Sequence, residues 1–204
     1  LQVVKECHYH RTIIVTHRPV VDKGWFEDFG KIFGMLDGYT YGSREMGESF
    51  EYLEKAAKKN PEAHYVYFAS MQDLRGAQLA GGKYDKNAAI FAAKYDMVII
   101  DEAHEGTQTE LGQNVIALLK HDNTHILNLS GTPFNLLEDY MEDEIFTWDY
   151  VMEQKAKSDW DLNHFGDPNP YAGLPRLNIF TFDLGKVLAG FDDVEDAAFN
   201  FKEF

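Results

Sequence analysis

Two carboxylates stand side by side where an apolar run of the chain ends. The run is Met97–Ile100, and Asp101, Glu102, Ala103 and His104 follow it. If the run is a strand of a parallel sheet, these side chains lie at its carboxyl end, where such sheets bind ligands. There Asp101 can hold Mg²⁺ through water, and Glu102 can deprotonate a water that attacks a phosphoryl group. The alternative is a strand that simply ends in solvated acids.

A second short apolar run, residues 125–129, ends in Ser130, Gly131, Thr132 and Pro133. One helical crossover separates the two runs, so the hydroxyls of Ser130 and Thr132 are expected near the carboxylate pair. There the two hydroxyls could transmit a change at a phosphate site. Taken by itself, the sequence Ser-Gly-Thr-Pro could also be a plain turn. The two signals in this order and spacing favour phosphoryl chemistry over two unrelated strand ends.

The elements that position these residues alternate between strand and helix. Near-continuous apolar runs predict strands at residues 12–16, 65–69, 97–100, 126–129 and 177–182. Helical periodicity predicts helices at residues 25–36, 50–59 and 107–119, the last with a capping box at its start. This alternation predicts an α/β fold whose parallel sheet is covered by helices on both faces. The acidic stretch 138–175 is expected to add helices and then a loop.

Composition limits the class of protein. The chain has 204 residues, 45% of them hydrophobic, and a net charge of −15. This indicates a globular domain and argues against a plain DNA-binding module, but it allows a motor that grips DNA through amides and hydroxyls. The single cysteine, Cys7, excludes an internal disulfide. The absence of a signal peptide and of a long apolar run predicts a cytoplasmic protein without a membrane span.

The motifs resemble those of a known family. Asp-Glu-Ala-His at 101–104 and Ser-Gly-Thr-Pro-Phe at 130–134 resemble motifs II and III of superfamily-two helicases and translocases. Thr-His-Arg-Pro at 16–19 resembles motif Ia, and Ser-Met-Gln-Asp-Leu at 70–74 resembles the next DNA-contacting motif. The sequences around these motifs are most similar to those of the motor subunits of type III restriction enzymes. The resemblance covers residues 11–136 well and implies a RecA-like P-loop NTPase lobe that uses ATP and Mg²⁺.

The resemblance also implies a role for each matching position. Asp101 would hold Mg²⁺, Glu102 would act as the catalytic base, and His104 would couple hydrolysis to motion. Three residues would border the nucleotide and link its site to DNA: Ser130, Gly131 and Thr132. Four residues would lie near the backbone of one DNA strand: Thr16, Arg18, Ser70 and Gln72. For Thr16 and Arg18, the alternative is a strand end with a solvated arginine.

One family motif is missing. The sequence has no phosphate loop of the form GxxxxGK[ST], and residues 76–84 only approximate it, with Tyr84 where Ser or Thr should stand. We interpret residues 76–84 as a flexible loop. Since the family's phosphate loop lies just upstream of motif Ia, we expect the chain to be a piece of a longer protein. Residues 1–184 would then be the first lobe without its P-loop strand, and residues 185–204 a linker and acidic helix leading to a second lobe.

The missing strand has two expected consequences. The 204 residues alone should bind ATP weakly or not at all and should not hydrolyse it. Residues 125–129 should form an exposed strand edge, which another segment or a neighbouring chain would cover.

The expected parent protein is a DNA helicase or translocase of a restriction or related defence system, accompanied by nuclease or methylase modules. A first alternative is a non-catalytic interaction domain that retains the motor fold. A second is a metal-dependent hydrolase that needs no nucleotide, which would require further metal ligands near Asp101.

Overall fold

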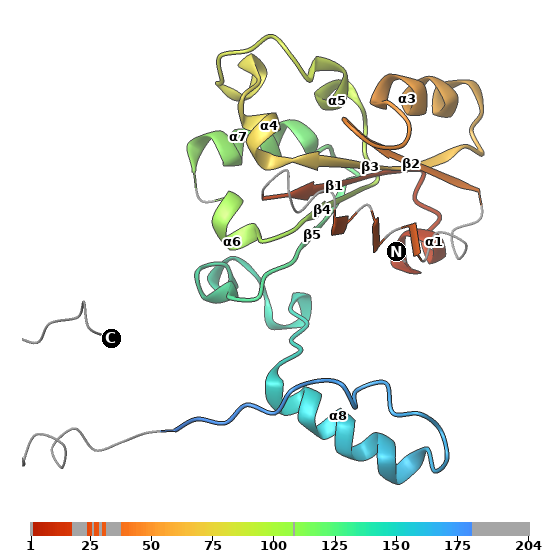
Figure 1. Cartoon of the computed structure of the whole chain (residues 1–204). Helices are drawn as coiled ribbons and strands as arrows, with labels where there is room; N and C mark the ends of the chain where they lie inside the picture. The colour runs from red at the N-terminus through yellow and green to blue at the C-terminus, as the bar shows by residue number, and fades with distance from the viewer. Residues whose placement is uncertain are drawn as a thin grey trace, which may run out of the picture. The chain divides into compact units, whose positions relative to one another are not determined.

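The computed structural model describes residues 2–17, 24–25, 27–28, 30–31, 38–107 and 109–180 (Figure 1). The chain divides into two compact units, Leu1–Ile145 and Phe146–Phe204, which we treat separately. The elements of the first unit are, in chain order, α1 (Gln2–Glu6), β1 (Arg11–Thr16), β2 (Tyr39–Ser43), α3 (Phe50–Lys59), β3 (His64–Ser70), α4 (Met71–Arg75), η2 (Gln78–Ala80), α5 (Ala88–Ala92), β4 (Met97–Ile100), α6 (Ala103–Gly106), α7 (Glu110–Leu119), β5 (His125–Asn128), η3 (Pro133–Asn135), η4 (Leu137–Asp139) and η5 (Glu142–Glu144).

The first unit is built on a five-stranded parallel sheet with the strand order β2-β3-β1-β4-β5. The central strand β1 pairs with β3 on one side and β4 on the other. Because every strand runs in the same direction, all five carboxyl ends lie along one edge. The predicted α/β class with a parallel sheet is confirmed.

Both faces of the sheet are covered, which explains the unbroken apolar runs. Ile13 and Ile14 are neighbours in β1 and point to opposite faces, yet both are fully buried. Ile13 belongs to a large core with residues of α3, α4, α5 and α7. Ile14 belongs to a smaller core with Val4 of α1 and the partly buried Trp25.

The predicted strands at residues 12–16, 65–69, 97–100 and 126–129 match β1, β3, β4 and β5 within one or two residues. The strand predicted at 177–182 is wrong for its described part, because residues 177–180 are not in a strand. Leu177, Ile179 and Phe180 are exposed there, so no sheet partner stabilises an extended conformation. Strand β2 was not predicted, because YTYGS mixes polar and aromatic residues at an edge of the sheet.

The helix predicted at 107–119 begins later than its capping-box pattern indicated. Thr109 is the N-cap of α7, and its Oγ1 accepts a hydrogen bond from the Gly112 N–H. Thr107 instead ends α6 and donates its hydroxyl hydrogen bond to the Ala103 carbonyl at 2.6 Å. Thr107 therefore closes α6, and α7 begins at Glu110 after the cap at Thr109.

The loop at 76–84 contains η2 and is closed by backbone hydrogen bonds, and its flexibility stays a prediction. The Tyr84 N–H donates to the Gly76 carbonyl at 3.0 Å, and the Gln78 N–H donates to the Tyr84 carbonyl at 2.8 Å. Gly82 approaches the backbone so closely that a Cβ there would lie 2.3 Å from the Gly76 carbonyl carbon. This closed loop follows α4 and is not a phosphate loop.

Strand β5 is an edge strand, as predicted. Among the described residues it pairs only with β4, and its Leu127 side chain is 41% exposed. A groove beside it is lined by side chains of α7, β5 and η4, among them Ile116, Ile126 and Asp139. No other segment of the described chain covers this edge, and its covering by a neighbouring chain stays a prediction.

The second unit contains α8 (Tyr150–Asn163), which begins where the Asp149 carboxylate accepts a hydrogen bond from the Met152 N–H. Lys157 of α8 donates to the carbonyls of Ala172 and Leu174, and this ties the following loop to the helix. The predicted linker and acidic helix at 185–204 lie outside the described residues. Among the described helices, none combines the length and the apolar character that crossing a bilayer requires.

Candidate functional site

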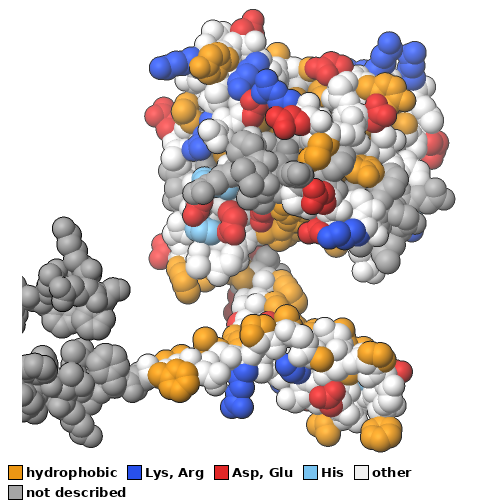
Figure 2. Space-filling model, viewed as in Figure 1, with side chains coloured by type: hydrophobic (Ala, Val, Ile, Leu, Met, Phe, Trp, Pro, Cys, Tyr) orange, Lys and Arg blue, Asp and Glu red, His pale blue; other side chains and the backbone are white. Residues whose placement is uncertain are grey.

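The end of β4 is fixed between its two neighbouring strands. The Asp101 N–H donates to the Val15 carbonyl of β1 at 2.8 Å, and the Ala103 N–H donates to the Leu129 carbonyl beyond β5 at 3.0 Å. These bonds hold the backbone of the acidic pair on both sides. Figure 2 shows acidic and histidine side chains gathered on this face near α6.

Asp101 has a partner that the sequence did not reveal. The indole N–H of Trp25 donates to Asp101 Oδ2 at 2.7 Å. The two residues are 76 positions apart, and the helical spacing around Trp25 predicts only a core residue. The bond uses one lone pair of Oδ2 and orients the carboxylate, whose remaining lone pairs can face a metal ion.

Glu102 has an unusual backbone conformation. Its φ is 50° and its ψ is 47°, in the left-handed region that side chains other than glycine rarely adopt. Such a conformation costs on the order of 1–2 kcal/mol and is concentrated at functional sites. The side chain is 48% exposed, so the carboxylate is accessible to solvent beside the strand end.

His104 connects the ends of β4 and β5. Its Nδ1 lies 2.8 Å from Ser130 Oγ and 3.3 Å from Glu102 Oε2. When Nδ1 carries a proton it can donate to Glu102, and when it does not it can accept from the Ser130 hydroxyl. The Ser130 hydroxyl can donate to Nδ1 or accept from it, whereas the Glu102 carboxylate can only accept.

The structure brings Ser130 to the acidic pair, and it places Gly131 and Thr132 farther out. The Thr132 N–H donates to Ser130 Oγ at 3.1 Å, whereas the Thr132 side chain is exposed. A Cβ at Gly131 would meet nothing within 4 Å, so packing does not require glycine there.

Three of the four candidate nucleic-acid residues lie farther along the same edge: Thr16, Ser70 and Gln72. Thr16 and Ser70 are direct neighbours in the register of β1 and β3, but both side chains are buried. Ser70 caps α4, since its Oγ accepts a hydrogen bond from the Asp73 N–H. Gln72 is exposed, and Arg18 lies outside the described residues.

The residues next to Arg18 still show how this edge is connected. His17 Nε2 lies 3.1 Å from Glu105 Oε2, which joins the end of β1 to α6. His17 Nδ1 is buried, and among the described residues it has no hydrogen-bond partner.

The site suits Mg²⁺ held by one carboxylate, water and phosphate oxygens. Mg²⁺ keeps much of its hydration and seldom occupies an all-protein cage. In the part of the chain that the structure describes, no group of three His, Cys, Asp or Glu side chains could hold a metal ion.

Comparison with known proteins shows which family this chain resembles in sequence. The family profile described as "Type III restriction enzyme, res subunit" matches residues 1–135. A Mycoplasma pneumoniae protein, named as the C-terminus of a type II restriction enzyme and methyltransferase, is 26% identical over 219 residues. That match covers 87% of this chain but only 29% of the relative's length. The Sulfolobus solfataricus SWI2/SNF2 ATPase core in complex with dsDNA has a TM-score of 0.43 and 17% identity, over 69% of this chain and 25% of that one.

Proposed function

Because the chain belongs to the type III restriction enzyme Res-subunit family, we propose that it forms part of a DNA helicase or translocase driven by ATP and Mg²⁺. The observation that carries this proposal is the arrangement at the ends of β4 and β5. There the Asp101–Glu102 pair lies beside His104, whose Nδ1 is 2.8 Å from Ser130. A restriction or related defence system is the proposed setting, with nuclease or methylase modules on the same protein or in the same complex.

The assignments of single residues follow the geometry of this edge. The carboxylate of Asp101 would bind Mg²⁺, and the bound ion would supply charge neutralisation for the phosphates of ATP. The carboxylate of Glu102 would accept the proton of the attacking water. His104 would transmit a change at the nucleotide site to Ser130. Gly131 and Thr132 would border the nucleotide.

We also propose where the rest of the ATP site belongs. The sequence supplies the acids but contains no GxxxxGK[ST] motif, so in this proposal the phosphate loop belongs to a longer protein. The open edge of β5 is the place where one more parallel strand can join the sheet. Residues 1–184 would then form most of the first motor lobe, and the 204 residues alone would not hydrolyse ATP.

The test is ATP turnover by the longer protein, measured with and without duplex DNA. DNA-stimulated, Mg²⁺-dependent turnover would support the motor assignment. A folded longer protein that binds no ATP and shows no turnover would reject it in favour of an interaction domain that retains the motor fold.

Replacing Trp25 by Phe should weaken the use of Mg²⁺. The change keeps an aromatic ring against the smaller core but removes the N–H that orients Asp101. Loss of such a supporting hydrogen bond typically costs 10–100-fold in metal affinity, so we expect the half-saturating Mg²⁺ concentration to rise about tenfold. ATP turnover titrated with Mg²⁺ measures this, and a fall in that concentration would show that the indole competes with the metal instead.

Replacing Ser130 by Ala should uncouple hydrolysis from DNA. Basal turnover should stay within about twofold, whereas stimulation by DNA should fall roughly fivefold, the lower end of usual coupling energies. The reason is that His104 loses its partner at the end of β5. Ser158→Ala, the same change on α8, is the control, and equal stimulation in the two variants would contradict the coupling role.

A further inference from the structure

The carboxylate of Asp73 is half-buried and forms hydrogen bonds with cationic side chains from separate segments of the chain. Asp73 of α4 accepts hydrogen bonds from Arg44 Nη1 at 2.6 Å and from Lys86 Nζ at 2.6 Å. Asn87 Nδ2 also donates to Asp73 Oδ2, at 2.9 Å. Partial burial by itself would raise the pKa of Asp73, but the bonds from Lys86 and Asn87 and the two positive charges outweigh burial, and the pKa is lowered. The carboxylate is therefore charged at neutral pH.

The cluster still has a net positive charge, because two cations share one anion. The Arg44 side chain is 68% exposed and has donors that Asp73 does not use. The Tyr84 ring is also exposed, and Lys86 Nζ lies 5.4 Å from its centroid. The stem of Lys86 packs on Gly76, where a Cβ would lie 3.1 Å from its Cε. Both cations are thus held in place, with Arg44 facing solvent and Lys86 partly exposed at 28%.

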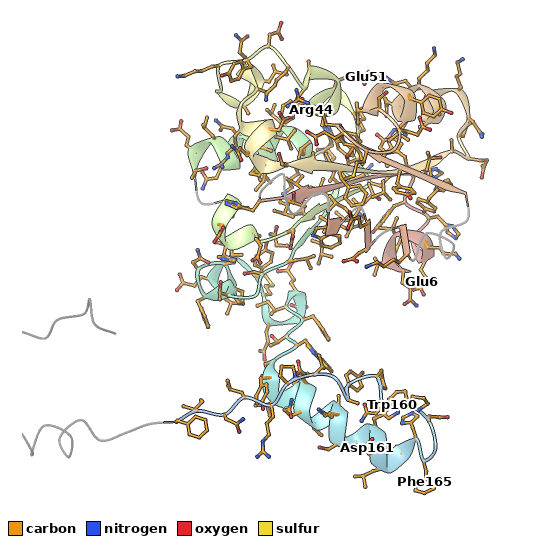
Figure 3. All side chains as sticks on the ribbon, in the orientation of Figure 1. Glu6, Arg44, Glu51, Trp160, Asp161 and Phe165 are labelled. Atoms are coloured by element: carbon orange, nitrogen blue, oxygen red, sulfur yellow. The ribbon has the colours of Figure 1, made fainter. Side chains whose placement is uncertain are left out.

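The position of the cluster matters as much as its charge. Arg44 follows β2 and Asp73 follows β3, so both lie on the edge that carries Ser70 and Gln72. The acids Asp101 and Glu102 lie farther along that edge, after β4. Figure 3 labels Arg44 between α4 and α3, and Figure 2 shows Lys and Arg side chains gathered where α4 is drawn. In a chain with a net charge of −15, this is a local site for an anion.

We propose that Arg44, Lys86 and Tyr84 bind one strand of DNA, the two cations on its phosphates and the ring beside an unpaired base, with Asp73 as a positioning residue. This inference rests on the proposed function. It assigns DNA contacts to residues other than the four that the motifs indicate, which are Thr16, Arg18, Ser70 and Gln72. Phosphate binding favours fixed cations, because ordering a free arginine on binding would cost entropy. An exposed aromatic ring next to cations is the usual combination for single-stranded nucleic acid.

The test is the binding of a fluorescent single-stranded 20-mer to the longer protein, without nucleotide, across a range of NaCl concentrations. Arg44→Glu and Lys86→Glu should each weaken binding roughly tenfold and flatten the dependence of log K on log salt by about one. Lys59→Glu makes the same charge change at the end of α3, near the opposite edge of the sheet, and should bind like the wild type.

Asp73→Asn separates positioning from charge. It makes the cluster more positive, so a purely electrostatic role predicts tighter binding, whereas a positioning role predicts weaker binding. Circular dichroism checks that this variant is folded, and Arg44→Glu decides the question if it is not.

Two outcomes would overturn the inference. If the glutamate variants bind as tightly as Lys59→Glu while DNA still stimulates ATP turnover, the strand lies elsewhere and the motor assignment stands. If the wild type neither binds the 20-mer nor responds to DNA, the ligand class is wrong and the motor assignment falls with it.

Discussion

Replacing Glu102 by Gln is expected to lower ATP turnover of the longer protein by at least about 10²-fold, the usual minimum for a lost general base. The amide has the same size as the carboxylate, so it can keep the left-handed backbone and the proximity to His104. It cannot accept the proton of the attacking water. Steady-state phosphate release with saturating DNA measures the loss, and ATP affinity should change little, because binding does not need a base.

Glu105→Gln is the matched control. Glu105 lies in the next helical turn, and its carboxylate is half exposed, 3.1 Å from His17 Nε2. An ion pair of that kind contributes little, about 0–1 kcal/mol, and turnover should stay within a few-fold of wild type. If both variants hydrolyse ATP alike, Glu102 is not the base, and the Asp-Glu-Ala-His sequence remains only as part of the scaffold.

The sequence predicts this site because its parts are local. The strands β1, β3 and β4 are short apolar runs with both faces buried, and the residues with candidate chemistry come directly after β4 and β5. Parallel strands then bring Asp101 and Ser130 to one edge without any knowledge of long-range contacts. His104 Nδ1 lies 2.8 Å from Ser130 Oγ. This contact connects the ends of β4 and β5, which the two motifs already predict to lie close together.

The partners of these residues were not predictable in the same way. The bond from Trp25 to Asp101 joins residues 76 positions apart, and nothing in the spacing of either one marks it. The Asp73 cluster combines three segments through single side-chain hydrogen bonds, which leave no periodic pattern. The left-handed conformation of Glu102 contradicts the local preference of glutamate, and only tertiary contacts on both sides of the strand end can impose it.

Replacing Phe68 by Ala should cost the first unit about 3–5 kcal/mol of its free energy of unfolding. Phe68 is fully buried in β3, in the smaller core with Ile14, Val66 and Met97. A loss of this size approaches the total stability of many domains, so the urea midpoint followed by circular dichroism should fall sharply. Phe134→Ala removes the same atoms from a side chain that is 81% exposed and should change stability by less than about 0.5 kcal/mol.

The same pair of variants shows how the core supports the site. β3 carries Ser70 and leads into α4, which bears Asp73, so the strand that Phe68 anchors also positions the proposed DNA contact. At low temperature, where the Phe68→Ala protein is still mostly folded, DNA binding per folded molecule should remain near the wild-type value. If DNA binding per folded molecule fell while the urea midpoint did not, Phe68 would itself contribute to the DNA interface. Equal midpoints for the two phenylalanine variants would instead mean that the smaller core adapts to the cavity and adds little to the stability of the sheet.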